Sequence, residues 1–159
     1  MDKRIYIQEL SDKKGENVML QGWVNAFRNQ GKMIFLDFRD KTGIVQGVIL
    51  PGSSAMEIGS TLREEFVVEV VGKVNPRPEK NIKTEVLNGD IELEVLDIKV
   101  LNSCQVLPFP IIEDTSVINE PLRLKYRYLD LRNPRLQKNI KNRFKVQNFI
   151  RNYLAEQDF

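Results

Sequence analysis

The chain has 159 residues, of which 42% are hydrophobic and 29% are charged, and its formal net charge is +2. This composition is ordinary for a soluble globular protein, and the length allows one domain with a core, or one small domain and a piece of another. We expect no membrane span, because no long uncharged apolar run occurs, and no signal peptide. The single cysteine, Cys104, excludes an internal disulfide and favours a reducing, cytoplasmic setting, and the absence of histidine removes the commonest general base and zinc ligand.

Charge is distributed unevenly along the chain. Residues 1–121 carry 14 Lys and Arg against 19 Asp and Glu, whereas residues 122–159 carry 10 against 3. The first part therefore lacks the uniformly basic surface that is typical of nucleic-acid-binding proteins. If it binds nucleic acid, it must do so through locally placed cations and stacking.

Alternation of apolar and polar residues predicts three strands near the N-terminus, after a polar lead-in whose Ile7 and Leu10 pack as a cap. Gly22 marks a point where a barrel strand could bend sharply. Glycines also mark the turns that follow the first and second strands. The predicted strands span residues 17–27, 33–39 and 43–50.

The second predicted strand carries an aromatic residue on its polar face. Ile34, Leu36 and Phe38 share one face, which we assign to the core, and Phe35 lies on the other. Arg28 is predicted in the turn before this strand and Gln46 on the next strand. An aromatic ring beside a cation and an amide suits an unstacked nucleobase, which needs a surface to stack on and groups that read its edge. The alternative is that Phe35 packs under a loop, since scattered surface aromatics need no special explanation.

One helix and two more strands complete the predicted first domain. Ser53 or Ser54 caps the helix, and strands at 66–74 and 91–101 flank a polar loop at 75–90. The apolar face of the helix is predicted to contain Met56, Ile58, Leu62 and Phe66. Five strands with one helix between the third and fourth is the order of an OB-fold, a mainly β, five-stranded Greek-key barrel that binds oligonucleotides or oligosaccharides.

The remainder of the chain is predicted to be a linker and a long helix. Cys104–Pro121 contains three prolines and little periodicity, which is typical of an ordered linker. Pro134 suits the first position of a helix that Asn133 caps. Because a single amphipathic helix is not a complete domain, we expect the chain to be the front part of a longer protein. The apolar side of this helix is predicted to contain Leu136, Ile140, Phe144, Ile150, Tyr153 and Leu154.

Three segments carry a resemblance to a known family: LQGWVNAFRNQGKMIFLDFRDKTGIVQ, RPEKNIKTEVLNGDIEL and EPLRLKYRYLDLRNPRLQ. They resemble the N-terminal part of aspartyl-tRNA synthetases of bacterial or organellar type. Lysyl- and asparaginyl-tRNA synthetases share the barrel and are the nearest alternatives. The resemblance implies that residues 1–104 are an anticodon-binding OB-fold domain and 105–131 a hinge. Residues 132–159 would then open a class II catalytic domain with the first half of its motif 1.

The resemblance also implies roles for individual residues. Phe35 would stack on the central anticodon base and Gln46 would contact that base, while Arg28 and Glu92 would contact the first base. A glutamate can accept hydrogen bonds from the N–H groups of a guanine edge. The alternative for Glu92 is a solvated carboxylate on a strand face.

The loop before the fifth predicted strand has two further implied site residues. Arg77 and Asn81 would lie near the third anticodon base. The alternative for Arg77 and for its neighbour Lys80 is that they are charges that keep a loop soluble.

No glycine-rich phosphate loop, metal cluster or nucleophile–base pair occurs in the chain. We therefore expect a recognition module with no catalytic residue, metal or cofactor of its own. The resemblance implies that the full-length enzyme is an aspartate–tRNA ligase, a cytoplasmic homodimer that uses ATP and Mg²⁺ and binds the anticodon loop of aspartate-specific tRNA. Two alternatives stay open, namely a sequence-tolerant single-strand-binding module and an assembly module that associates through its apolar helix. Arg123, Lys125, Arg127 and Arg132 either touch tRNA, pair with Asp130 or pack against another domain.

Overall fold

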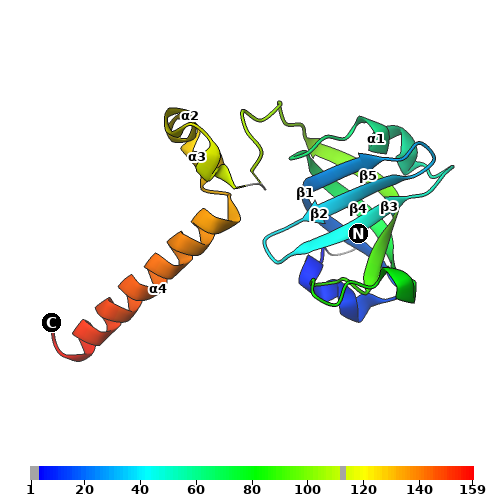
Figure 1. Ribbon diagram of the computed structural model, residues 1–159. Helices are drawn as coiled ribbons and strands as arrows, with labels where there is room; N and C mark the ends of the chain where they lie inside the picture. Colours follow the sequence, from blue (N-terminus) through cyan, green and yellow to red (C-terminus); the bar gives the residue numbers. More distant parts are fainter. Residues whose placement is uncertain (1–3, 112–113) are drawn as a thin grey trace. The chain divides into compact units, whose positions relative to one another are not determined.

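The computed structural model describes residues 4–111 and 114–159, which form two compact units that divide between Gln105 and Val106 (Figure 1). In the first unit the elements are η1 (Ile7–Lys13), β1 (Asn17–Asn29), β2 (Ile34–Arg39), β3 (Ile44–Ile49), α1 (Ala55–Thr61), β4 (Val67–Pro76), η2 (Glu79–Asn81) and β5 (Ile91–Asn102). The second unit contains η3 (Thr115–Val117), α2 (Glu120–Lys125), α3 (Arg127–Asp130) and α4 (Pro134–Glu156).

The five strands close into a barrel in the order β1-β2-β3-β5-β4, with β4 paired to β1. All neighbouring pairs are antiparallel except β3 and β5, which pair in parallel at Gly47–Leu93 and Val48–Glu94. The helix α1 lies between the third and fourth strands in the chain. This arrangement confirms the predicted OB-fold.

The barrel interior is filled by alternate residues of each strand. Ile34, Leu36 and Phe38 of β2 are 1%, 0% and 2% exposed, as the alternation predicts. Ile7 and Leu10 of η1 are buried in the same cluster, so the N-terminal segment caps the core as expected. At roughly 25 cal/mol per Å² of apolar surface, burial of this cluster is the main stabilising contribution to the unit.

An irregularity in β1 follows Gly22, the residue at which a bend was predicted. The register with β2 shifts between Val24 and Ala26, which is where the bulge occurs. At Gly22 a side chain would instead collide with the carbonyl oxygen of Arg39. Glycine is therefore required at this position because the β2 backbone approaches closely.

The helix α1 differs from its prediction. It ends at Thr61, so Leu62 and Phe66 follow the helix. Leu62 is buried in the core and Met56 and Phe66 pack against it, as predicted, whereas Ile58 is 37% exposed. Ala55 and Gly59 lie one turn apart and are buried against the barrel. Position 59 requires glycine because a side chain there would collide with Ile49.

Both serines near the start of α1 form hydrogen bonds. Ser53 Oγ accepts from the N–H of Ala55, the first residue of the helix, at 3.2 Å. Ser54 occupies the N-cap position, but its Oγ donates to the carbonyl of Leu96 on β5 at 2.9 Å. The N-cap residue is therefore Ser54, without a side-chain cap hydrogen bond, and both serines tie the start of the helix to β5, since Ser53 Oγ also donates to the carbonyl of Val95 at 3.3 Å.

The second unit has a small core of Phe109, Ile111 and Leu129. The predicted start of α4 is confirmed: Pro134 is its first residue, and Asn133 Oδ1 accepts from the N–H of Arg135 at 3.0 Å. Residues 105–131, expected to be a hinge, contain η3, α2 and α3. None of the helices in the described ranges has the length and apolar character needed to cross a membrane.

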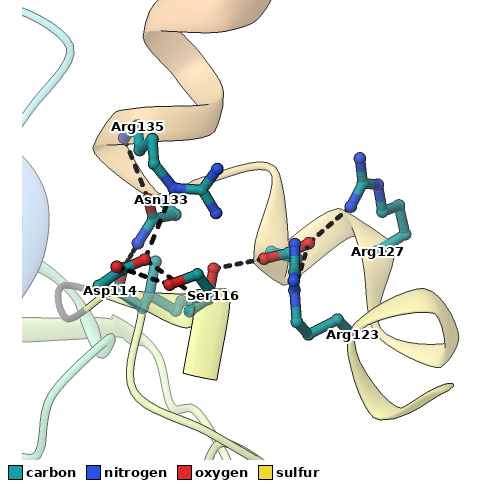
Figure 2. Close-up of polar contacts among 9 residues, drawn as sticks. Asp114, Ser116, Arg123, Arg127, Asn133 and Arg135 are labelled. Carbon is teal, nitrogen blue, oxygen red and sulfur yellow. Dashed lines mark hydrogen bonds and ion pairs between the residues drawn. The ribbon is translucent and has the colours of Figure 1, made fainter. Parts of the chain in front are cut away.

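A buried carboxylate organises the short helices of the second unit. Asp130 is 0% exposed and accepts a hydrogen bond from Thr115 Oγ1 at 2.7 Å. Arg127 Nη1 and Arg123 Nε lie 2.6 and 3.3 Å from its Oδ2, and Figure 2 shows these two arginines converging on one carboxylate. Burial raises the pKa of Asp130, but the Thr115 hydrogen bond and the two guanidinium groups outweigh it and lower the pKa overall. Of the alternatives for Arg123 and Arg127, intramolecular pairing is therefore what the structure contains.

Candidate nucleic-acid interface

An open pocket of about 360 Å³ lies on the outside of the barrel, between its strands and the loop that joins β4 to β5. A volume of this order suits a small-molecule ligand or one exposed base. Five of the six residues predicted from the sequence line it, and Arg28 does not. The lining residues are Phe35, Gln46, Arg77, Lys80, Asn81, Ile82, Lys83 and Glu92.

Strand register places the aromatic ring and the amide side by side. Phe35 pairs with Val48, and Gln46 pairs with Asp37, so Phe35 and Gln46 are diagonal neighbours on the outer face of β2 and β3. Phe35 is half-buried and lies outside the hydrophobic core. Its ring is therefore available at the pocket as a surface on which a base can stack.

Arg77 reaches from the β4–β5 loop across to β3. Its Nη2 donates to Gln46 Oε1 at 2.7 Å, and its backbone N–H donates to the carbonyl of Asp90 at 2.8 Å. Arg77 is 9% exposed, so it is not a solvated charge that serves only to keep the loop soluble. Lys80, by contrast, is exposed at the rim of the pocket.

Glu92 and Arg28 occupy different environments. Glu92 is half-buried in the pocket wall on β5, and its carboxylate has no hydrogen-bond or ion-pair partner among the described residues. Arg28 belongs to β1 and not to the turn, because β1 continues to Asn29, and it pairs in register with Phe35. Its Nη2 lies 3.4 Å from Asp37 Oδ2, an exposed pair of the kind that contributes little to stability.

The β4–β5 loop is held in place by contacts with the N-terminal segment. Asn88 Nδ2 donates to the carbonyl of Ile7 at 2.9 Å, and Ser11 Oγ donates to Asn88 Oδ1 at 2.9 Å. The Lys14 ammonium donates to Asp90 at 2.6 Å and thereby lowers the pKa of that carboxyl. In Figure 1 the loop (green) and η1 (blue) accordingly lie together at one end of the barrel.

Asp40 anchors the same segment to the β2–β3 turn. Its Oδ2 accepts from the N–H of Ile7 at 2.9 Å, and its Oδ1 accepts from the N–H and hydroxyl of Thr42, both at 2.6 Å. Burial raises the pKa of Asp40, but these hydrogen bonds outweigh it and lower the pKa overall. The pocket loop therefore packs on η1, which is itself held by a buried carboxylate.

Pocket electrostatics are locally basic although the first part of the chain is acidic. Three cations, Arg77, Lys80 and Lys83, face one carboxylate, Glu92. Such a local cluster of cations can attract the phosphates of a nucleic acid even when the protein surface as a whole is not basic. Ile82 and Lys83 were not predicted as site residues; their position directly after Asn81 in the same loop was the available signal. In the part of the chain that the structure describes, no group of His, Cys, Asp or Glu is arranged to hold a metal ion.

Comparison with known families agrees with this geometry. The family model described as OB-fold nucleic acid binding domain matches residues 18–101. The chain belongs to this family. Its OB-fold domain is followed by a match to the family of class II tRNA synthetases (D, K and N) at residues 119–159.

Curated relatives of this OB-fold chain are aspartate–tRNA ligases. That of Staphylococcus aureus strain Newman is 42% identical over 147 residues, and that of Exiguobacterium sibiricum is 45% identical over 148 residues. Each alignment covers 91% of this chain but only 25% and 24% of the relative, so the chain spans about a quarter of their length. The resemblance to aspartyl-tRNA synthetases is thereby confirmed.

Solved structures show the same fold. A protein assigned as an aspartyl-tRNA synthetase from Leishmania major Friedlin is 26% identical and has a TM-score of 0.84, covering 99% of this chain and 34% of that one. The asparaginyl-tRNA synthetase of Pyrococcus horikoshii, solved with asparaginyl-adenylate, is 31% identical with a TM-score of 0.76 and covers 99% and 35%. The likeness of the barrel extends across both enzyme families, as the sequence analysis expected.

Proposed function

We propose that this chain is the anticodon-binding region of an aspartate–tRNA ligase and that its barrel pocket receives an unstacked base of the anticodon loop. The observation that carries the proposal is the meeting of a half-buried ring, an amide, cations and a carboxylate in one pocket of an OB-fold nucleic acid binding domain. Stacking supplies affinity for any base, and the polar groups around the ring select among bases.

The roles implied by the resemblance become proposals for this site. Phe35 stacks on the central anticodon base and Gln46 contacts its edge. Glu92 accepts from the N–H groups of a guanine in the first position, and its half-buried carboxylate favours that role over a solvated one. Arg28 contacts the first base from outside the pocket, after leaving Asp37. Arg77 and Asn81 lie near the third base.

We further propose that the whole protein shares the activity of its relatives. It would join aspartate to aspartate-specific tRNA in the cytoplasm, with ATP and Mg²⁺ as in class II synthetases generally. In that protein, residues 1–104 would be the anticodon domain, 105–131 the hinge and 132–159 the start of the catalytic domain. When bound there, ATP and Mg²⁺ would supply the activation of the amino acid, and the described residues of this chain would contribute recognition of the tRNA.

A binding titration tests the proposed recognition. The chain is titrated with an anticodon stem-loop carrying GUC and with one carrying the same bases in scrambled order, at several salt concentrations. We expect the GUC loop to bind more tightly by at least about tenfold, since each mismatched base contact is worth roughly 1–3 kcal/mol. Equal affinity for the two loops at every salt concentration would instead support the sequence-tolerant binder.

The exposed face of α4 favours a second role in assembly. Phe144 and Phe149 are 65% and 72% exposed, and the rings of Phe149 and Tyr153 stack at 6.5 Å. Apolar surface of this kind is typical of an interface, and a homodimer through it is proposed for the whole protein. Sedimentation of the chain beside a Phe144→Glu, Phe149→Glu variant tests the role: the variant should lose any concentration-dependent mass that the parent has, and an identical mass for both contradicts it.

A further inference from the structure

The guanidinium of Arg77 meets the amide of Gln46 at the pocket, with Nη2 and Oε1 2.7 Å apart. Guanidinium groups carry donors and no acceptor, so the amide atom that faces Arg77 must be the oxygen. The amide nitrogen, Nε2, then points away from Arg77 and has no hydrogen-bond partner among the residues that the structure describes. The side chain of Gln46 is thereby held in one of its two amide orientations.

This arrangement is not the one that stability alone would select. Arg77 is 9% exposed, and its Nε is buried without an acceptor in the described part of the chain. A buried donor without a partner costs free energy, and an apolar side chain of similar length would avoid that cost. Departures from the rule that buried polar groups are hydrogen-bonded are expected at functional sites.

We propose that Arg77 is a positioning residue that fixes Gln46 as a hydrogen-bond donor and so makes the pocket select a base with a carbonyl group over one with an amino group. The inference rests on the proposed function, because it assumes that the anticodon base stacked on Phe35 faces Gln46. Uracil presents the carbonyl O4 where cytosine presents the amino group N4. With Nε2 fixed toward the base, uracil gains a hydrogen bond, whereas cytosine places two donors against each other.

A free amide would not make this distinction. Rotation by 180° exchanges the oxygen and nitrogen of a glutamine side chain, so an unrestrained Gln46 could donate to uracil or accept from cytosine. Discrimination between uracil and cytosine therefore depends on the hydrogen bond from Arg77 to Gln46. Arg77 need not contact the base itself, because it acts by orienting the Gln46 amide.

The test compares two stem-loops, GUC and GCC, that differ in the central base alone. The parent chain should prefer GUC by roughly 5- to 150-fold, the value of one well-placed base contact. Arg77→Met keeps the length of the side chain and removes its donors, and it should bring the ratio to within about twofold of one. Lys80→Ala removes a cation of the same pocket that has no hydrogen bond to Gln46 among the described residues, so it should weaken both loops equally and leave the ratio unchanged.

Two further variants separate orientation from folding. Arg77→Lys retains a donor and should restore part of the preference for GUC. Gln46→Glu keeps an oxygen for Arg77 but offers no N–H to the base, so it should reverse the preference toward GCC, whose amino group can donate to the carboxylate. Thermal unfolding of each variant identifies any that fails to fold, and Gln46→Glu provides the decisive comparison if Arg77→Met does not fold.

The possible outcomes distinguish the two proposals. If the parent prefers GUC and Arg77→Met keeps the full ratio, the positioning role is wrong while the proposed function stands. If Gln46→Glu keeps the preference for GUC, the donor role of Gln46 is wrong. If the parent binds GUC no better than a scrambled loop, the proposed function fails and this inference fails with it.

Discussion

Replacing Phe35 with alanine is the most direct perturbation of the pocket. A base stacked on an aromatic side chain contributes roughly 1–3 kcal/mol, so the Kd for a GUC stem-loop should rise roughly 5- to 150-fold. Because Phe35 is half-buried and lies outside the core, folding should lose about 2 kcal/mol, less than the ~3–5 kcal/mol of a core phenylalanine. A domain of typical stability, about 5–15 kcal/mol, stays folded after such a loss.

Fluorescence anisotropy with a labelled stem-loop measures the effect, and thermal unfolding confirms the fold. Phe35→Trp retains a surface for stacking and should bind within about threefold of the parent. Ile44→Ala is the matched control, since Ile44 is an outward-facing residue of the neighbouring strand, 43% exposed, and does not line the pocket. If Phe35→Ala is folded and binds as tightly as the parent, the ring does not stack on a base.

Three further changes test the remaining groups. Glu92→Gln should weaken binding of loops with guanine in the first position by roughly 1–3 kcal/mol, because an amide oxygen accepts less well than a carboxylate, and a loop with adenine there should be less affected. Arg28→Ala should raise the Kd about two- to tenfold and lower the salt dependence of the binding constant by about one unit of slope. The free energy of unfolding should change by less than about 1 kcal/mol, because the ion pair of Arg28 with Asp37 is exposed. Asp40 has a lowered pKa, so its contribution to stability is complete above the unfolded value of 3.8 and is lost as the pH falls through the folded value. Asp40→Asn should therefore unfold at a lower temperature near neutral pH but lose less stability than the parent on acidification to pH 3; equal losses would contradict the role of this carboxylate.

Local pattern predicted the elements and the face on which each side chain lies. A period of two is a property of any strand, so residues 33–39 placed Phe35 opposite the core before any partner strand was known. The cap at Asn133 and Pro134 is likewise a local property of a helix start. Two short-range expectations were wrong: Arg28 belongs to β1 and not to the turn, because β1 continues to Asn29, and Ile58 of α1 is 37% exposed although it was assigned to the apolar face.

Sequence by itself thus determined the order of elements, the faces of the strands and, through the family resemblance, which residues to consider for the site. Tertiary structure alone decided which of them meet. Closure of the barrel brings Arg77 onto Gln46, which is 31 positions earlier, and leaves Arg28 outside the pocket beside Asp37. Periodicity reports the direction of a side chain relative to its own strand, whereas contact between distant segments depends on the packing of the whole barrel, which no local pattern contains.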